Sequence, residues 1–178
     1  MQPLPHICVM QRTDFSQAHC PIARTLDLVG EWWSLLIIRE AFLGVTRYDD
    51  FQQRLGISRN ALTDRLKKLV DGGVLTRRPV TPGAKREEYV LTRMGDDLIT
   101  VVVAMLQWGD RWLTLPGKPL SRMVEAATGC EVETLRVRSG DGRPLSRAEV
   151  GFAAAPGYAE PALPVQGLSD VPAAAPNG

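Results

Sequence analysis

The chain has 178 residues and a formal net charge of +1, a length that suits one domain with appendages and a charge that does not by itself indicate a nucleic-acid partner. Residues 98–106, the most apolar stretch, are too few to span a membrane, and residues 1–15 do not resemble a signal peptide. The three cysteines are widely spaced, which argues against a disulfide framework and predicts a cytoplasmic protein.

Composition divides the chain into four segments. We expect an N-terminal arm over residues 1–19, a folded domain over residues 20–115, a small extension over residues 116–155 and a disordered tail over residues 156–178. The tail is rich in alanine and proline and carries almost no charge, so it cannot bury enough surface to offset the entropy of ordering it.

Residues 20–71 contain start and stop signals for four helices. Pro21 suits the first turn of a helix, Ser58 is a good N-cap, and Gly56 marks the turn between the third and fourth helices. Residues 32–43 are apolar nearly all round and are expected to form the buried central helix. The predicted helices run from Pro21 to Gly30, from Trp32 to Leu43, from Tyr48 to Leu55 and from Ser58 to Val70.

A β-hairpin and a last helix are predicted next. Val74–Val80 and Glu87–Thr92 have strand-like composition, and residues 81–84 between them form a turn. Thr92 would cap a long helix whose first turn contains Asp96 and Asp97. The fold class is therefore mainly α with a small hairpin wing, in the arrangement of a winged helix-turn-helix, followed by a small irregular or β extension.

The helix that begins at Ser58 has one apolar and one polar face. Leu62, Leu66, Leu69 and Val70 form a stripe for the core. The polar face suits DNA base edges, because arginine binds guanine, asparagine binds adenine and threonine contacts thymine or either base pair. In a helix-turn-helix the second helix enters the major groove, so residues 58–71 are the predicted recognition helix. Its polar residues are Arg59, Asn60, Thr63, Asp64 and Lys67.

Positive charge is concentrated around this helix and the hairpin. Residues 54–86 contain nine basic and two acidic residues, which gives 9 − 2 = +7 in a chain whose total is +1. This asymmetry suits phosphate neutralisation, and residues 80–87 of the wing are expected on the DNA backbone or in the minor groove. The predicted DNA contacts are Arg47, Ser58, Arg59, Asn60, Thr63, Asp64, Lys67, Lys68, Lys85 and Arg86.

Three alternatives remain beside this interpretation. The polar helix is a solvated amphipathic helix next to an unrelated hairpin, or the winged helix makes only protein contacts, although arginine and asparagine on its polar face argue against that. The third is a thiol enzyme that uses Cys20. No nucleophile motif or phosphate loop is present and neither histidine has a recognisable partner carboxylate, so no enzyme is predicted.

A combined pattern of residues over about residues 20–113 matches a known family. The matching residues are CPIARTLDLVG at 20–30, WSLLIIRE at 33–40, Arg47, Tyr48, Phe51, Ile57, Ser58, Leu62, Thr63, Leu66, Gly73, Leu75, YVLT at 89–92, Gly95, Trp108 and Gly109. In these residues the chain resembles the HxlR-type winged helix-turn-helix regulators. The resemblance implies a dimeric regulator that binds double-stranded DNA in the bacterial nucleoid and represses or activates nearby genes in response to oxidants, electrophiles or other small molecules. One departure is Trp32, which stands where members usually carry lysine or arginine. A phosphate contact is therefore absent there, or is supplied by Arg24 or Arg47.

The last helix is the predicted dimer interface. Two apolar rows lie side by side on it, so that one row can pack on the domain and the other on a partner helix; in the alternative, both rows are core. A homodimer would place two recognition helices on an inverted-repeat operator. The predicted interface row is Leu98, Val101, Met105, Trp108 and Trp112, and the second row is Ile99, Val102, Leu106 and Leu113.

Cys20 is the candidate effector site. It precedes the first helix, whose positive dipole end favours a thiolate, and the resemblance implies a redox or electrophile sensor in some members. The alternatives are a capping residue without signalling, or a small-molecule pocket near the dimer helices. His6, Cys8, His19 and Cys20 match no zinc pattern, so no metal and no cofactor are predicted.

The extension resembles a degenerate copy of the ribbon that follows the last helix in some relatives. Such ribbons carry paired Cys-Gly knuckles, of which only Gly129-Cys130 and residues 140–142 remain. Short strands are predicted at Val132–Arg138 and Ala148–Phe152, without zinc.

Overall fold

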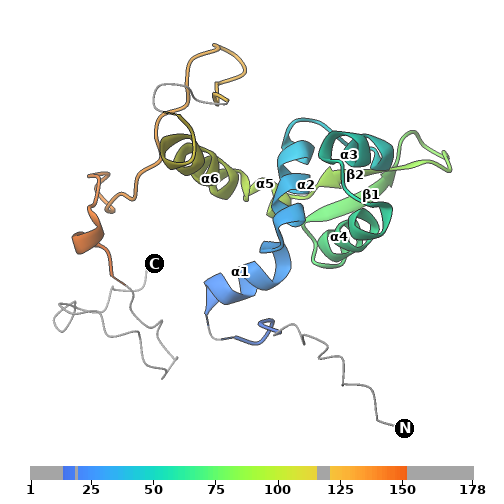
Figure 1. Ribbon diagram of the computed structural model, residues 1–178, viewed down its shortest axis with the longest axis horizontal. Coiled ribbons are helices and arrows are strands. Elements are labelled where there is room, and N and C mark those ends of the chain that lie inside the picture. The colour runs from blue at the N-terminus through green and yellow to red at the C-terminus, as the bar shows by residue number, and fades with distance from the viewer. Residues whose placement is uncertain (1–13, 19, 116–120, 152–178) are drawn as a thin grey trace, which may run out of the picture. The chain divides into compact units, whose positions relative to one another are not determined.

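The computed structural model describes residues 14–18, 20–115 and 121–151, and its elements follow the predicted order (Figure 1). The chain divides into two compact units, Met1–Arg122 and Met123–Gly178. The predicted tail and most of the predicted arm lie outside the described residues. The elements are α1 (Pro21–Val29), α2 (Trp32–Phe42), α3 (Tyr48–Leu55), α4 (Arg59–Asp71), β1 (Leu75–Pro79), β2 (Glu87–Leu91), α5 (Arg93–Asp96), α6 (Ile99–Trp112) and the 3-10 helix η1 (Arg147–Glu149).

Helix α2 is the centre of the first unit, as its apolar sequence predicts. It packs against α1, α3, α4, β2 and α6. Ile37 and Ile38 of α2 are completely buried, together with Phe51 of α3 and Leu66 of α4. The N-terminal end of α2 differs from its middle, because Trp32 is 74% exposed. The core therefore packs both α3 and α4 against the same central helix, α2.

The turn between α3 and α4 follows from local sequence signals. Gly56 ends α3 in the left-handed region at φ 63°, a conformation that costs glycine little. The Ser58 hydroxyl then accepts a hydrogen bond from the backbone N–H of Ala61 at 3.3 Å and caps α4. Ile57 between them is buried. These three residues set where the second helix of the pair begins.

Strands β1 and β2 form the predicted antiparallel hairpin, with Leu75 opposite Leu91 and Pro79 opposite Glu87. Its loop turns at Gly83, which has φ 80°, and projects beyond α3 and α4 in Figure 1. The N–H of Tyr89 donates to the carbonyl oxygen of Thr46 at 2.8 Å, so β2 is joined to the segment before α3. The wing is thus anchored beside the helix pair.

The prediction of one long helix after Thr92 is wrong, because the segment is divided into α5 and α6. The Thr92 hydroxyl accepts from the N–H of Gly95 at 3.1 Å and donates to the carbonyl of Gly73 at 2.6 Å, which holds a single helical turn against the segment before β1. The N–H of Leu98 then bonds to Gly95 three residues back, and α6 begins anew. None of the helices that the structure describes is long and apolar enough to cross a membrane.

Gly95 is required by this packing. A Cβ at this position would overlap the carbonyl oxygen of Val74 and lie 2.9 Å from Cδ2 of Leu91. Since a backbone atom cannot move aside cheaply, Gly95→Ala is expected to destabilise the protein by about 2 kcal/mol and to lower its melting temperature by roughly 5–10 °C. Thermal unfolding followed by circular dichroism measures this. Gly140→Ala, where nothing lies near the new Cβ, is the control; equal melting temperatures for the two variants would refute the packing argument.

The described part of the second unit, residues 123–151, contains tight turns and η1. The strand predicted at Val132–Arg138 is wrong, and so are residues 148–151 of the strand predicted at Ala148–Phe152, while Phe152 lies outside the described residues. Only isolated bridges occur in its described part, Val124 with Glu131 and Arg138 with Pro144. Residues 132–138 are exposed and pair with no strand among the described residues, and Ala148 belongs to η1. Local hydrogen bonds, and not a buried sheet, therefore hold the described part of this unit.

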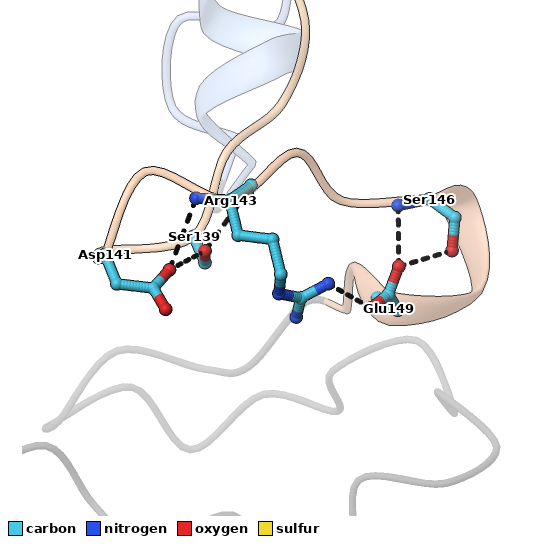
Figure 2. Close-up of polar contacts among 5 residues, drawn as sticks. All are labelled: Ser139, Asp141, Arg143, Ser146 and Glu149. Atoms are coloured by element: carbon cyan, nitrogen blue, oxygen red, sulfur yellow. Dashed lines mark hydrogen bonds and ion pairs between the residues drawn. The ribbon is translucent and has the colours of Figure 1, made fainter.

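Those local bonds form a chain of polar side chains, shown in Figure 2. Asp141 accepts from the Ser139 hydroxyl and from the N–H of Arg143. Arg143 reaches Glu149 at 2.6 Å, and Glu149 also accepts from the N–H and hydroxyl of Ser146. The bonds from Ser146, followed by that from Arg143, lower the pKa of Glu149 to about 2. These local bonds explain why residues 139–149 form turns and not strands.

Candidate nucleic-acid interface

The N-terminal turn of α4 is fastened to α3 by Tyr48. The Tyr48 hydroxyl lies 2.9 Å from the carbonyl oxygen of Arg59 and 3.0 Å from the hydroxyl of Thr63. Thr63 is a predicted DNA contact; it is exposed, and its hydroxyl has a partner on α3. Tyr48 itself was not predicted to have a role in the site. It positions the first two turns of α4 relative to α3.

The outward face of α4 presents Asn60, Asp64 and Lys67, at spacings of four and three residues that place them in one row. All three are exposed, while Leu62 and Leu66 on the opposite face are completely buried. Ser58 and Arg59 are also exposed at the start of the helix. The structure therefore brings together most of the predicted base-contacting residues on one accessible surface.

Lys68 does not belong to that surface. Its ammonium group donates to the carbonyl oxygen of Asp27 in α1 and lies 3.9 Å from the Asp27 carboxylate. Arg65 is turned inward in the same way and lies 3.6 Å from Glu31. These two cations hold α4 against α1 and the segment before α2. A DNA contact by Lys68 stays a prediction, and its ammonium group is engaged with Asp27 in this structure.

The strands of the wing carry internally paired charges. Arg77 lies 3.9 Å from Glu87 and 5.5 Å from the centre of the Tyr89 ring, and Arg78 lies 2.7 Å from Glu88. The hydrogen bond from Arg78 lowers the pKa of the Glu88 carboxyl. The two strands of the hairpin therefore have almost no net charge. The unpaired basic residues of the wing, Lys85 and Arg86, lie at its tip.

Ion pairing changes the meaning of the charge count for residues 54–86. Six of the nine basic residues form ion pairs with carboxylates, and five of the six partners lie outside α4 and the turn that follows it. Lys67 is the only one of the six on the outward face, and it lies 2.6 Å from Asp71. Within the described part of the chain, the predicted contact cations without an ion pair are Arg47, Arg59, Lys85 and Arg86.

Glu40 is a site residue that the sequence did not predict. It is 3% exposed and accepts hydrogen bonds from Arg39 at 2.6 Å and from Arg54 of α3. Burial raises the pKa of Glu40, but the bonds from Arg54 and Arg39 outweigh it and hold the pKa below its usual value. Glu40 thus ties α3 to the central helix. The sequence did contain a sign of this role, because Glu40 is the single carboxylate within the apolar sequence of α2.

Cys20 is the exposed residue before α1, and Pro21 occupies the first turn as expected. Its carbonyl oxygen accepts the N–H of Arg24 at 3.1 Å, and its thiol is free. Cys130 is also exposed and belongs to the second unit. His6, Cys8 and His19 lie outside the described residues.

Helix α6 leaves much of its predicted interface row exposed. Val101 is 42% exposed, Met105 51%, Trp108 59% and Trp112 67%. Leu98 is the exception, since it packs against the core of its own unit and precedes α6. Val103, which is in neither predicted row, is the buried residue of this helix. The exposed row therefore begins at Val101.

Comparison with known proteins identifies the family. The model of the HxlR-like helix-turn-helix matches residues 28–116. The chain belongs to the HxlR family. Rv3095 of Mycobacterium tuberculosis, described as an uncharacterized helix-turn-helix-type transcriptional regulator, is 36% identical over 137 residues, which cover 77% of this chain and 87% of that protein. The regulator sll1512 of Synechocystis is 35% identical over 114 residues, covering 61% and 84%.

Two solved structures are similar to this HxlR-family chain. PA1607, described as a candidate transcription factor, has a TM-score of 0.75 and 41% identity, and the match covers 79% of this chain and 99% of that one. PA1374 from Pseudomonas aeruginosa, described in the same way, has a TM-score of 0.57 and 39% identity over 79% and 96%. The winged-helix fold and the helix-turn-helix are thus those of a transcriptional regulator.

Proposed function

We propose that this HxlR-family regulator binds an inverted-repeat DNA operator as a homodimer, with α4 in the major groove and the wing on the neighbouring backbone or minor groove. The observation that carries the proposal is the outward face of α4, where Asn60, Asp64 and Lys67 are exposed beside Arg59. These side chains have hydrogen-bond donors and acceptors that can pair with the base edges in the major groove, where the base pairs differ.

The unpaired cations support the same arrangement. Arg47 precedes α3, Arg59 begins α4, and Lys85 and Arg86 lie in the loop of the wing, so they belong to the helix pair and the wing. A cation already paired with a carboxylate has less charge to offer a phosphate, whereas these four retain theirs. They fit phosphate contacts on either side of the groove that α4 would enter.

The exposed row of α6 supports a homodimer. Large apolar side chains that remain exposed together mark an interaction surface more often than they mark free solvent contact. Met105, Trp108 and Trp112 are spaced at helical intervals and are each more than half exposed. A second copy of α6 offers the same row, so a two-fold contact would bury both. Two copies of α4 would then address the two halves of an operator.

A gel shift with the full chain and its own upstream DNA tests this function. We expect a complex that forms at low salt and weakens steeply as salt rises, because phosphate contacts release counterions. An unrelated duplex of equal length is the control. If neither the upstream DNA nor any duplex selected from a random pool is bound, the proposal is wrong.

The same experiment tests Cys20 as the effector site. Oxidation of an exposed thiol ahead of α1 is expected to release the DNA, and Cys20→Ser is expected to keep the complex under the same oxidant. Cys130→Ser is the matched control and should respond as the wild type does. Equal binding by the wild-type chain with and without oxidant would leave the DNA-binding function intact and remove the thiol from it.

A further inference from the structure

The outward face of α4 contains one negative charge that its surroundings do not neutralise. Asp64 is exposed, and within the described part of the chain its carboxylate has no hydrogen bond or ion pair. It lies in the middle of the row, four residues after Asn60 and three before Lys67. Arg59, the unpaired cation at the start of the same helix, favours an approaching polyanion. The negative charge of the Asp64 carboxylate repels such a polyanion.

The neighbouring cations are bound elsewhere. On a helix, Asp64 has Lys67 and Lys68 within reach, three and four residues further on. Lys67 pairs with Asp71 at 2.6 Å, and Lys68 donates to the carbonyl oxygen of Asp27. The fold therefore leaves the Asp64 carboxylate free, and both of its oxygens are available as hydrogen-bond acceptors.

We propose that Asp64 determines sequence specificity by accepting a hydrogen bond from the exocyclic amino group of a cytosine in the major groove. This inference rests on the proposed function and assigns a role to one group in it. A carboxylate only accepts hydrogen bonds, so it requires a donor, and cytosine N4 is the amino group that aspartate typically contacts. Adenine also has an amino group there, but its N7 acceptor lies beside it and repels a carboxylate.

The negative charge of Asp64 also affects its binding to every DNA sequence, which a neutral hydrogen-bonding residue would not do. Asp64 repels phosphates on every DNA sequence and gains a compensating bond only where the cytosine is present. It therefore lowers affinity for DNA in general while it favours the correct site. Removal of the carboxylate is expected to strengthen non-specific binding and to weaken discrimination, two changes that a merely structural residue would not produce together.

The test compares the full-length wild type with Asp64→Ala and with the control Asp97→Ala, which removes an equal charge from the exposed residue after α5. Duplexes selected by each protein from a random pool are sequenced. Fluorescence anisotropy then measures binding to the selected duplex, to the same duplex with the preferred cytosine changed to thymine, and to an unrelated duplex. Melting temperatures establish that all three proteins are folded.

We expect the wild type and Asp97→Ala to prefer the cytosine duplex by about tenfold and Asp64→Ala to show no preference at that base pair. Asp64→Ala should also bind the unrelated duplex about two- to fivefold more tightly. If the wild type selects a sequence and Asp64→Ala keeps the same preference at every position, this inference fails while the proposed function stands. If the wild type selects no sequence, both fail.

Discussion

The paired substitution Arg59→Ala and Lys67→Ala is expected to reduce specific operator binding by at least about 100-fold while the dimer persists. Arg59 is the unpaired cation at the first turn of α4, and Lys67 lies on the outward face one turn beyond Asp64. Loss of one base contact costs about 1–3 kcal/mol, and loss of a phosphate contact adds to it. Both side chains are exposed, so the core should remain intact. Anisotropy with the selected duplex measures affinity, and light scattering measures mass.

The control is the pair Arg93→Ala and Arg136→Ala, which removes the same charge from exposed residues outside α4 and the wing. This control should bind the operator within about twofold of the wild type if local contacts dominate over net charge. Unchanged affinity in the Arg59 and Lys67 pair, or an equal loss in the control pair, would contradict the assignment of α4 as the recognition helix.

Trp108→Glu is expected to convert the dimer into monomers and to raise the dissociation constant of the dimer by at least about 100-fold. Trp108 is 59% exposed within its own chain, so a glutamate there remains solvated in the monomer. In a two-fold contact between α6 helices it would bury an unpaired carboxylate from each copy, which costs about 3–5 kcal/mol. Operator affinity should fall with it, since two linked half-site contacts become single ones.

Size-exclusion chromatography with light scattering gives the mass of Trp108→Glu, and far-UV circular dichroism tests that its helices are kept. Leu43→Glu is the matched control, because Leu43 is similarly exposed at 65% but lies at the end of α2. It should remain dimeric. A dimeric Trp108→Glu protein with full operator affinity would move the interface away from α6.

Element boundaries in residues 20–91 could be predicted because each depends on a few neighbouring residues. Pro21 at the start of α1, Gly56 after α3 and the capping hydroxyl of Ser58 act within one helical turn. The hairpin likewise follows from its turn sequence. The order of helices, the wing and the outward face of α4 were therefore accessible from the sequence, together with the resemblance to HxlR regulators.

The predictions of one long last helix and of two strands in the extension are wrong, because residues distant in sequence decide the conformation of these segments. Thr92 bonds to Gly73, 19 residues earlier, and Gly95 lies against the carbonyl oxygen of Val74, so α5 is a separate turn packed on that segment and α6 begins after it. The strands expected near Val132 and Ala148 have suitable residues but no partner strand. Strand propensity expresses packing against neighbours, and without them the segment keeps only local turns.

The sequence by itself determined the family, the element order and which residues share the outward face of α4, since periodicity and capping are local properties. Only the tertiary structure decided which charges remain available on that surface. Lys68 and Arg65 are engaged by residues 41 and 34 positions earlier, and Arg77 and Arg78 by the opposite strand. A charge count treats all cations alike, whereas the fold pairs some of them. Among the described residues it leaves Arg59, Lys85, Arg86 and the carboxylate of Asp64 without an ion pair, because pairing depends on distance in space and not along the chain.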